Sequence, residues 1–159
     1  MEHSQHKGHK DHQKHYITLG VMAVLSFVAM YALMYSMVNK YENVFTSVNQ
    51  FYMAATMTMP MVIIEIILMR HMYMNKKLNF VILTISVVAL IGFYTGIRKQ
   101  VAVNDRQFLK SMIPHHAGAI LMCQESDISD PEIKRLCEEI VASQQKEIDE
   151  MKRKLEELK

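Results

Sequence analysis

The chain has no tryptophan, two cysteines, three prolines and five glycines among its 159 residues. Two cysteines are too few for a disulfide framework. Without tryptophan, anchoring at a membrane surface would fall to the seven tyrosines and to lysine and arginine side chains. The formal net charge of +2 comes with no basic face interleaved with aromatic residues, so nucleic acid is not an expected partner.

The chain is rich in methionine, with fifteen, and half of its residues are hydrophobic. Apolar residues collect between Tyr16 and Ile97, and charged residues collect after Arg98. Runs of this length and polarity predict membrane-spanning helices, because each can cross a hydrocarbon core of about 30 Å. We therefore expect an all-α chain with a membrane region at 16–97 (spans at about 17–38, 50–69 and 79–97), a linker at 98–104 and a soluble helical pair at 105–159.

Residues 1–15 carry a histidine at every third position, namely His3, His6, His9, His12 and His15. The segment has no apolar residue after Met1, so it cannot bury a core and is expected to be disordered. Spaced imidazoles on such a tail can chelate Cu(II), Ni(II) or Zn(II). The alternative is a merely solvated polar tail.

The second span contains a four-residue repeat of methionines with one carboxylate, namely Met53, Met57, Met61, Glu65 and Met69. On a helix this spacing makes one slanted stripe. An ionisable residue in a span usually faces a bundle interior or a polar path, so the stripe is either a metal path or ordinary packing with Glu65 paired to a tyrosine or to the backbone. Pro60 predicts a kink. In the third span, Gly92 and Gly96 form a small-residue pattern that allows close helix packing.

The soluble pair begins with Asp105 as the expected N-cap of a helix that ends near Glu125. Pro114 lies inside that helix and predicts a kink or a local break. Asp130 caps a second helix, with Pro131 at its first position. Two helices alone bury too little surface to be stable, so we expect a partner, most simply a second copy that completes a four-helix bundle.

The first soluble helix places a sulfur ligand next to two imidazoles. Met112 and His116 are four residues apart and Met112 and His115 are three apart, so these side chains project from neighbouring positions. In the second helix, Glu147 and Met151 would lie opposite them. A thioether with imidazole suits Cu(I) better than magnesium or calcium. The alternative for either histidine is a hydrogen-bonded core residue.

Three further residues of the helical pair leave alternatives open. Gln144 either sets the register of the bundle or donates a hydrogen bond that orients His115 or His116. Cys123 and Cys137 lie on either side of the turn. They form a disulfide in an oxidising compartment, or a dithiolate for Cu(I), or a pair of small buried hydrophobic residues.

Motifs of catalysis are missing from the soluble part. It contains no Glu-x-x-His of the di-iron bundles and no His-Glu-x-x-His of the zinc proteases. Neither histidine has a local serine or cysteine nucleophile with a third orienting group. We therefore do not expect an enzyme.

The soluble part resembles domain-of-unknown-function family 305, which includes the CopM-type copper-resistance proteins. The likeness covers about residues 105–158. It rests on two runs, Phe108…Met112-Ile113-Pro114-His115-His116-Ala117-Gly118-Ala119-Ile120…Met122 and Ile140…Gln144…Glu147-Ile148…Met151…Leu155.

The resemblance implies a ferritin-like helical bundle on the envelope side of a bacterial membrane that binds copper and silver through methionine and histidine. The ligands it implies here are Met112, His115, His116, Met122 and Met151. Cys123 and Cys137 depart from it, since small residues such as alanine usually stand at those positions. The three spans and the tail also lie outside the likeness.

The expected function is copper binding that contributes to copper tolerance by sequestration, with Cu(I) or silver at the soluble pair and Cu(II) at the tail. The alternatives are a copper transport or efflux component that uses the methionine-rich spans, and a non-metal scaffold that dimerises at a membrane. Expected partners are metal ions, membrane lipid and further copies of the chain. The distribution of lysine and arginine weakly favours a bacterial inner membrane protein with a cytoplasmic N-terminus and an outward C-terminal domain.

Overall fold

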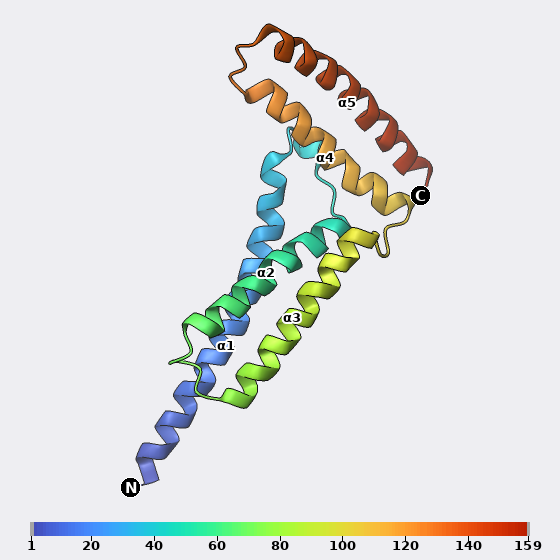
Figure 1. The fold of residues 1–159 in the computed structure, drawn as a ribbon. Helices are drawn as coiled ribbons and strands as arrows, with labels where there is room; N and C mark the ends of the chain where they lie inside the picture. The colour runs from blue at the N-terminus through green and yellow to red at the C-terminus, as the bar shows by residue number, and fades with distance from the viewer. Residues whose placement is uncertain (1, 159) are drawn as a thin grey trace. The chain divides into compact units, whose positions relative to one another are not determined.

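The computed structural model describes residues 2–158, with side chains from Lys14 onward. The elements of this part of the chain are all helical: α1 (Glu2–Leu33), the 3-10 turns η1 (Met34–Met37) and η2 (Tyr41–Asn43), α2 (Val48–Leu68), α3 (Lys76–Lys99), α4 (Asp105–Glu125) and α5 (Pro131–Glu157) (Figure 1). The all-α prediction is confirmed.

Metal binding by the His-rich tail stays a prediction. We expected residues 1–15 to be disordered, whereas residues 2–15 are the first part of α1. Four of the five expected tail ligands (His3, His6, His9 and His12) are residues whose side chains are not described. The side chain of His15 is described and is partly buried.

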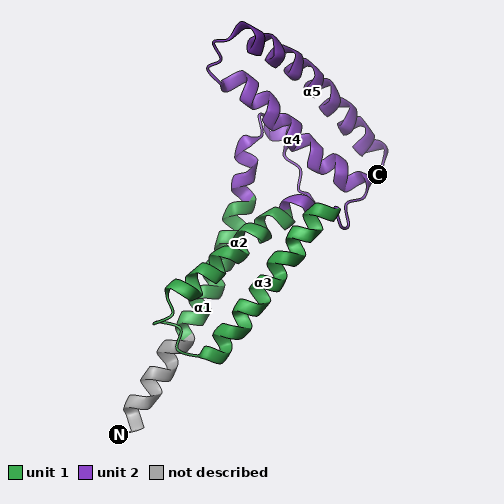
Figure 2. Cartoon of the chain, in the orientation of Figure 1, with its two compact units in different colours: residues 1–31, 51–99 green, residues 32–50, 100–159 purple. Residues whose placement is uncertain are grey.

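The chain divides into two compact units, which Figure 2 colours separately. Unit 1 consists of residues 1–31 and 51–99, and unit 2 of residues 32–50 and 100–159. The connection between α1 and α2 therefore belongs with the C-terminal helices rather than with the helices that it joins.

Three helices are long and apolar enough to cross a membrane, by length and composition: Lys14–Met37, Val48–Leu68 and Lys76–Lys99. The first of these changes from α-helix to a 3-10 turn after Leu33, so the first predicted span is not one continuous α-helix. Pro60 lies inside α2 without ending it. Many apolar side chains of these helices face outward, such as Leu25 (64% exposed) and Ile85 (62% exposed), as expected for surfaces in contact with lipid.

Unit 1 has a small core formed by Leu19, Val62, Ile66 and Tyr73. Of the two glycines of α3, Gly96 makes the predicted close approach to a neighbouring helix and Gly92 does not. A Cβ atom on Gly96 would lie 3.2 Å from Cε2 of Tyr52, whereas a Cβ on Gly92 would meet nothing within 4 Å.

In unit 2, α4 and α5 form an antiparallel hairpin (Figure 1). The N-cap of α4 is Asn104 and not Asp105, because the Asn104 side chain accepts the backbone N–H of Gln107 at 3.0 Å. The cap predicted for α5 is confirmed, since Asp130 Oδ1 accepts two backbone N–H groups at 2.8 and 3.0 Å. Pro114 stays inside a continuous α4, so the predicted local break is absent.

The core of unit 2 is formed by five buried residues of the hairpin: Ile113, Ala117, Ile120, Ile148 and Leu155. Val38 and Phe45, from the connection between α1 and α2, pack against this cluster. The first residue of α2 is also held to α4, by a hydrogen bond from the Val48 N–H to Gln107 Oε1 at 3.0 Å. Part of the cover that we expected from a second copy therefore comes from the chain itself.

Candidate metal centre

His116 links the two helices of the hairpin. Its side chain is almost fully buried, and its Nε2 lies 2.7 Å from Glu147 Oε2. Its Nδ1 lies 2.9 Å from the carbonyl oxygen of Met112, one turn earlier in α4. On α5, the Ser143 hydroxyl donates to the other oxygen of Glu147 at 2.8 Å. The chain Ser143–Glu147–His116–Met112 thus joins both helices through directed hydrogen bonds.

Both ring nitrogens of His116 are engaged inside the hairpin. Nδ1 contacts a backbone carbonyl oxygen of α4, and Nε2 contacts a carboxylate oxygen of α5. The Ser143 hydroxyl and then the His116 ring stabilise the ionised form and lower the pKa of Glu147. In this arrangement His116 holds the hairpin together.

The lowered pKa of Glu147 predicts an acid-sensitive hairpin. The stability that ionised Glu147 gives to the folded hairpin is present in full above the ordinary carboxyl pKa of 4.5. It is lost as the pH falls through the lower pKa that Glu147 has in the folded state. Urea unfolding of unit 2 should show that the advantage of the native chain over Glu147→Gln shrinks between about pH 5 and pH 3. The control is Glu139→Gln, another exposed carboxylate of α5, whose Oε1 is 3.9 Å from Arg135. An equal pH response in both variants would contradict the prediction.

The other sulfur and imidazole ligands predicted on α4 lie on a different face of the helix. One stripe contains Phe108, Met112, His115, Ala119 and Met122, at alternating steps of four and three residues. Phe108 is 51% exposed, Met122 is 53% exposed and His115 is exposed, while Met112 and Ala119 are partly buried. We call these five residues the α4 stripe.

The structure therefore separates the predicted ligands into groups. His116 and Glu147 meet between the helices, while Met112, His115 and Met122 lie on the α4 stripe. Met151 is partly buried and packs against the hydrophobic core. The residue that orients His116 is Glu147, not Gln144. Sequence reasoning missed Ser143, although its position four residues before Glu147 on one helix was a usable signal.

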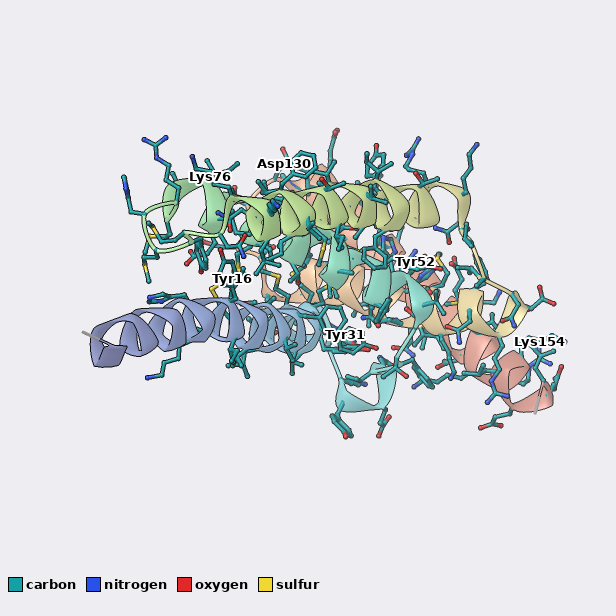
Figure 3. All side chains as sticks on the ribbon, turned by 90° about the horizontal axis from the view of Figure 1, so that it is seen from below. Tyr16, Tyr31, Tyr52, Lys76, Asp130 and Lys154 are labelled. Atoms are coloured by element: carbon teal, nitrogen blue, oxygen red, sulfur yellow. A yellow bond between two sulfur atoms is a disulfide. The ribbon has the colours of Figure 1, made fainter. Side chains whose placement is uncertain are left out.

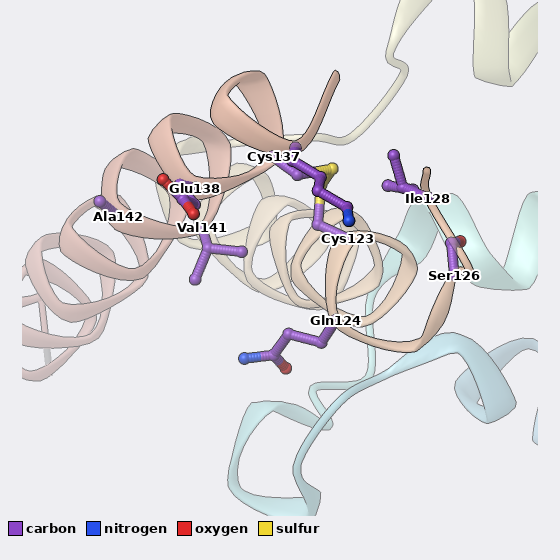
Figure 4. Close-up of a pocket in the computed structure, with 9 residues that line it drawn as sticks. Cys123, Gln124, Ser126, Ile128, Cys137, Glu138, Val141 and Ala142 are labelled. Carbon is purple, nitrogen blue, oxygen red and sulfur yellow. A yellow bond between two sulfur atoms is a disulfide. The ribbon is translucent and has the colours of Figure 1, made fainter. Parts of the chain in front are cut away.

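Cys123 and Cys137 form a disulfide between α4 and α5, with their Cα atoms 5.2 Å apart (Figure 4). Of the three alternatives for this pair, the structure contains the disulfide. Neither sulfur is a thiolate in this state, so neither serves as a metal ligand here. The bond joins the helices beside the turn.

In unit 1, the methionine stripe of α2 lies beside the buried face of the helix, and its first two methionines are exposed. The face of α2 that is buried carries Ala54, Ala55, Thr58, Val62 and Ile66. Met53 and Met57 do not belong to this face and are 46% and 43% exposed. Met61 is partly buried.

Glu65 is partly buried and accepts a hydrogen bond from the Tyr73 hydroxyl at 3.4 Å, so its predicted pairing with a tyrosine is confirmed. Burial, followed by the Glu65 carboxylate, raises the pKa of Tyr73, which keeps the phenol a donor. Among the described side chains, no three His, Cys, Asp or Glu residues come close enough to share a metal ion.

The structure defines an all-α protein with three helices of membrane-spanning character and a disulfide-linked hairpin that carries histidine and methionine. Residues 94–155 match the family described as Domain of unknown function (DUF305). An uncharacterized protein of Acanthamoeba polyphaga mimivirus is 38% identical over 143 residues, which cover 87% of this chain and 91% of the relative. Residues 94–155 are therefore a DUF305 domain. No solved structure matches the chain.

Proposed function

We propose that the protein binds Cu(I), and silver in the same way, at the α4 stripe, and that it contributes to copper tolerance by sequestering the ion at a membrane. The observation that carries the proposal is the position of Met112, His115 and Met122 on one accessible face of α4. Two thioethers and one imidazole form a soft, uncharged ligand set that suits Cu(I). The metal is the cargo of this site and not a cofactor.

A second copy of the chain would complete the site. Along the α4 stripe, Met112 and Met122 lie five residues to either side of Ala117, and His115 and Ala119 lie two residues to either side. If two α4 helices pack antiparallel about a two-fold axis at this level, Met112 and His115 of one chain face Met122 of the second copy. The same symmetry places the small side chain of Ala119 opposite His115, which leaves room for an ion. Two equivalent sites result.

The spacing of the α4 stripe also favours this pairing. Alternating steps of four and three residues are the spacing at which two helices pack side by side. Phe108, Met112 and Met122 provide an apolar surface that is partly exposed in one chain and that a second copy would cover. We therefore propose a homodimer whose contact and whose metal sites use the same face.

Within this site, His116 acts as a positioning residue. Its Nδ1 contacts the carbonyl oxygen of Met112, and its Nε2 is held by Glu147 on α5. The contact holds the turn that carries both Met112 and His115 against the opposite helix. Outer contacts of this kind commonly change metal affinity by about 10–100-fold when they are removed.

The disulfide supports an orientation in the membrane. Disulfides persist in oxidising compartments, so we propose that unit 2 faces outward, in agreement with the bias of lysine and arginine. Three spans place the N-terminal tail on the opposite, cytoplasmic side. The relative is viral, and the proposal does not depend on the bacterial source that the resemblance implied.

The test is a Cu(I) titration of the full chain in detergent against a competing chelator. Replacing a ligand, in His115→Ala or Met122→Leu, is expected to weaken binding at unit 2 by about tenfold or more. The matched control is Met151→Leu, which removes a thioether that packs against the core and should leave the affinity unchanged. The dimer fraction, measured by sedimentation, should rise with Cu(I) in the native chain and in the control.

Two results would contradict the proposal. If Met122→Leu bound Cu(I) as tightly as the native chain, the α4 stripe would not be the site. If the folded native chain dimerised and bound no Cu(I), unit 2 would be the non-metal scaffold. Transport predicts copper flux into vesicles, and the outward positions of Met53 and Met57 do not favour it.

A further inference from the structure

The connection between α2 and α3 is the second place where soft ligands gather. Residues 69–75 contain four of them, Met69, His71, Met72 and Met74. The backbone N–H of Met72 donates to the carbonyl oxygen of Met69 at 2.8 Å, which closes a turn with His71 inside it. A turn closed in this way keeps its first and last Cα atoms within about 7 Å. We call this segment the methionine turn.

The methionine turn is anchored from inside. Tyr73 is 4% exposed and belongs to the core of unit 1. Its hydroxyl donates to Glu65, and its carbonyl oxygen accepts from Asn79 Nδ2 at 2.7 Å. Tyr73 is therefore the fixed residue between Met72 and Met74.

Tyr16, near the middle of α1, holds the turn from the other side. The Tyr16 hydroxyl donates to Asn79 Oδ1 at 2.7 Å and accepts the backbone N–H of Asn75 at 3.1 Å. The rings of Tyr16 and Tyr73 also pack, with centroids 5.2 Å apart. Tyr16 and Lys76 lie at the same end of unit 1 (Figure 3). This network gives the turn a defined shape before any ligand arrives.

Three of the four ligands of this anchored turn are exposed. Met74 is 61% exposed, Met69 is 39% exposed and His71 is exposed, while Met72 is partly buried against the core. Packing alone accounts for Tyr73 and Met72 but not for the exposed Met69, His71 and Met74. A fixed backbone that presents thioethers and one imidazole outward is a preorganised site for a soft cation.

We propose that the methionine turn is a second Cu(I) site, with Met69, His71, Met72 and Met74 as its donors. Arg70, Lys76 and Lys77 are exposed nearby. Their positive charges oppose a bound cation and weaken its binding at the turn.

The experiment uses the full chain in lipid nanodiscs with 13C-labelled methionine methyl groups, titrated with Ag(I). The methyl signals of Met69, Met72 and Met74 are expected to shift, and that of Met53, a comparably exposed methionine of α2, is expected to stay. His71→Ala should raise the Ag(I) concentration needed for these shifts by about tenfold. Unchanged shifts in His71→Ala, or shifts of Met53 equal to those of the turn, would overturn the proposal.

A second arm separates this site from the α4 stripe. In Met122→Leu the turn signals should still shift, because the turn belongs to unit 1 and shares no residue with the stripe. If Ag(I) shifted the methyl signals of the turn in the native chain and left that of Met112 unchanged, the proposed function would be overturned and the second site supported. If it shifted the Met112 signal and left those of the turn unchanged, the second site would be overturned and the proposed function supported.

Discussion

Replacing Ile148 with alanine is expected to lower the free energy of unfolding of unit 2 by about 2–5 kcal/mol. Ile148 is completely buried in the cluster where α5 meets Ile113 and Ala117 of α4. The substitution removes three carbon atoms from a packed position and leaves a cavity. Because Glu147 is the neighbouring residue, loosening α5 here should also weaken the contact between Glu147 and His116.

Amide hydrogen exchange measures this effect in unit 2 separately from the spans. The amides of α4 and α5 should exchange faster in Ile148→Ala, by about tenfold for each 1.4 kcal/mol lost. The matched control is Ile133→Ala, the same change on the same helix at a residue that is 49% exposed, with an expected effect within about 0.5 kcal/mol. Should Ile148→Ala fail to fold, Ile148→Val is expected to cost about 0.5–1.5 kcal/mol. Equal effects at both isoleucines would contradict the assigned core.

Removing the disulfide is expected to cost unit 2 about 3 kcal/mol, the value for a closed loop of this size. Cys123 and Cys137 are separated by 14 residues, and their bond restricts the unfolded hairpin as well as joining the folded helices. The double variant Cys123→Ser with Cys137→Ser should therefore exchange its α4 and α5 amides about a hundredfold faster. The effect should be concentrated in unit 2, because both cysteines belong to it.

The native chain treated with a thiol reductant is the control for changes in side-chain packing. Reduction should reproduce the effect of the double variant, and the variant itself should not respond to the reductant. If reduction left the exchange of α4 and α5 unchanged, the disulfide would not stabilise the hairpin. Cu(I) binding measured after reduction would show whether the stability of the hairpin affects the α4 stripe.

These results bear on how the candidate site is supported. In the proposed site Met112, His115 and Met122 come from one helix and need a partner surface, so their relative positions depend on α4 being held straight and in place. These contacts hold α4 at two levels along α5: the disulfide at Cys137, and the burial of Ile148 together with the His116–Glu147 contact one residue earlier. A ligand set held by several independent contacts loses less affinity when one of them is removed.

Local features of the chain were determined by the amino-acid sequence alone. The three spans follow from apolar runs, and the start of α5 follows from Asp130 and Pro131, because each signal is complete within a few neighbouring residues. The methionine and histidine pattern of α4 was likewise sufficient to indicate the family that residues 94–155 match. The pairing of Glu65 with a tyrosine was foreseen because an ionisable group in an apolar helix needs a partner.

Only the tertiary structure decided which of these signals act together. Periodicity placed Met112 near both histidines, but the packing of α5 turned His116 inward and left His115 outside. The partner of His116 is Glu147 and not Gln144. The close helix contact is made by Gly96 and not by Gly92. Both outcomes depend on residues far away in the sequence. The cover of α4 by Val38 and Phe45 depends on such distant residues too. A helix pattern defines which residues share a face, and only the neighbouring segments determine which face is buried.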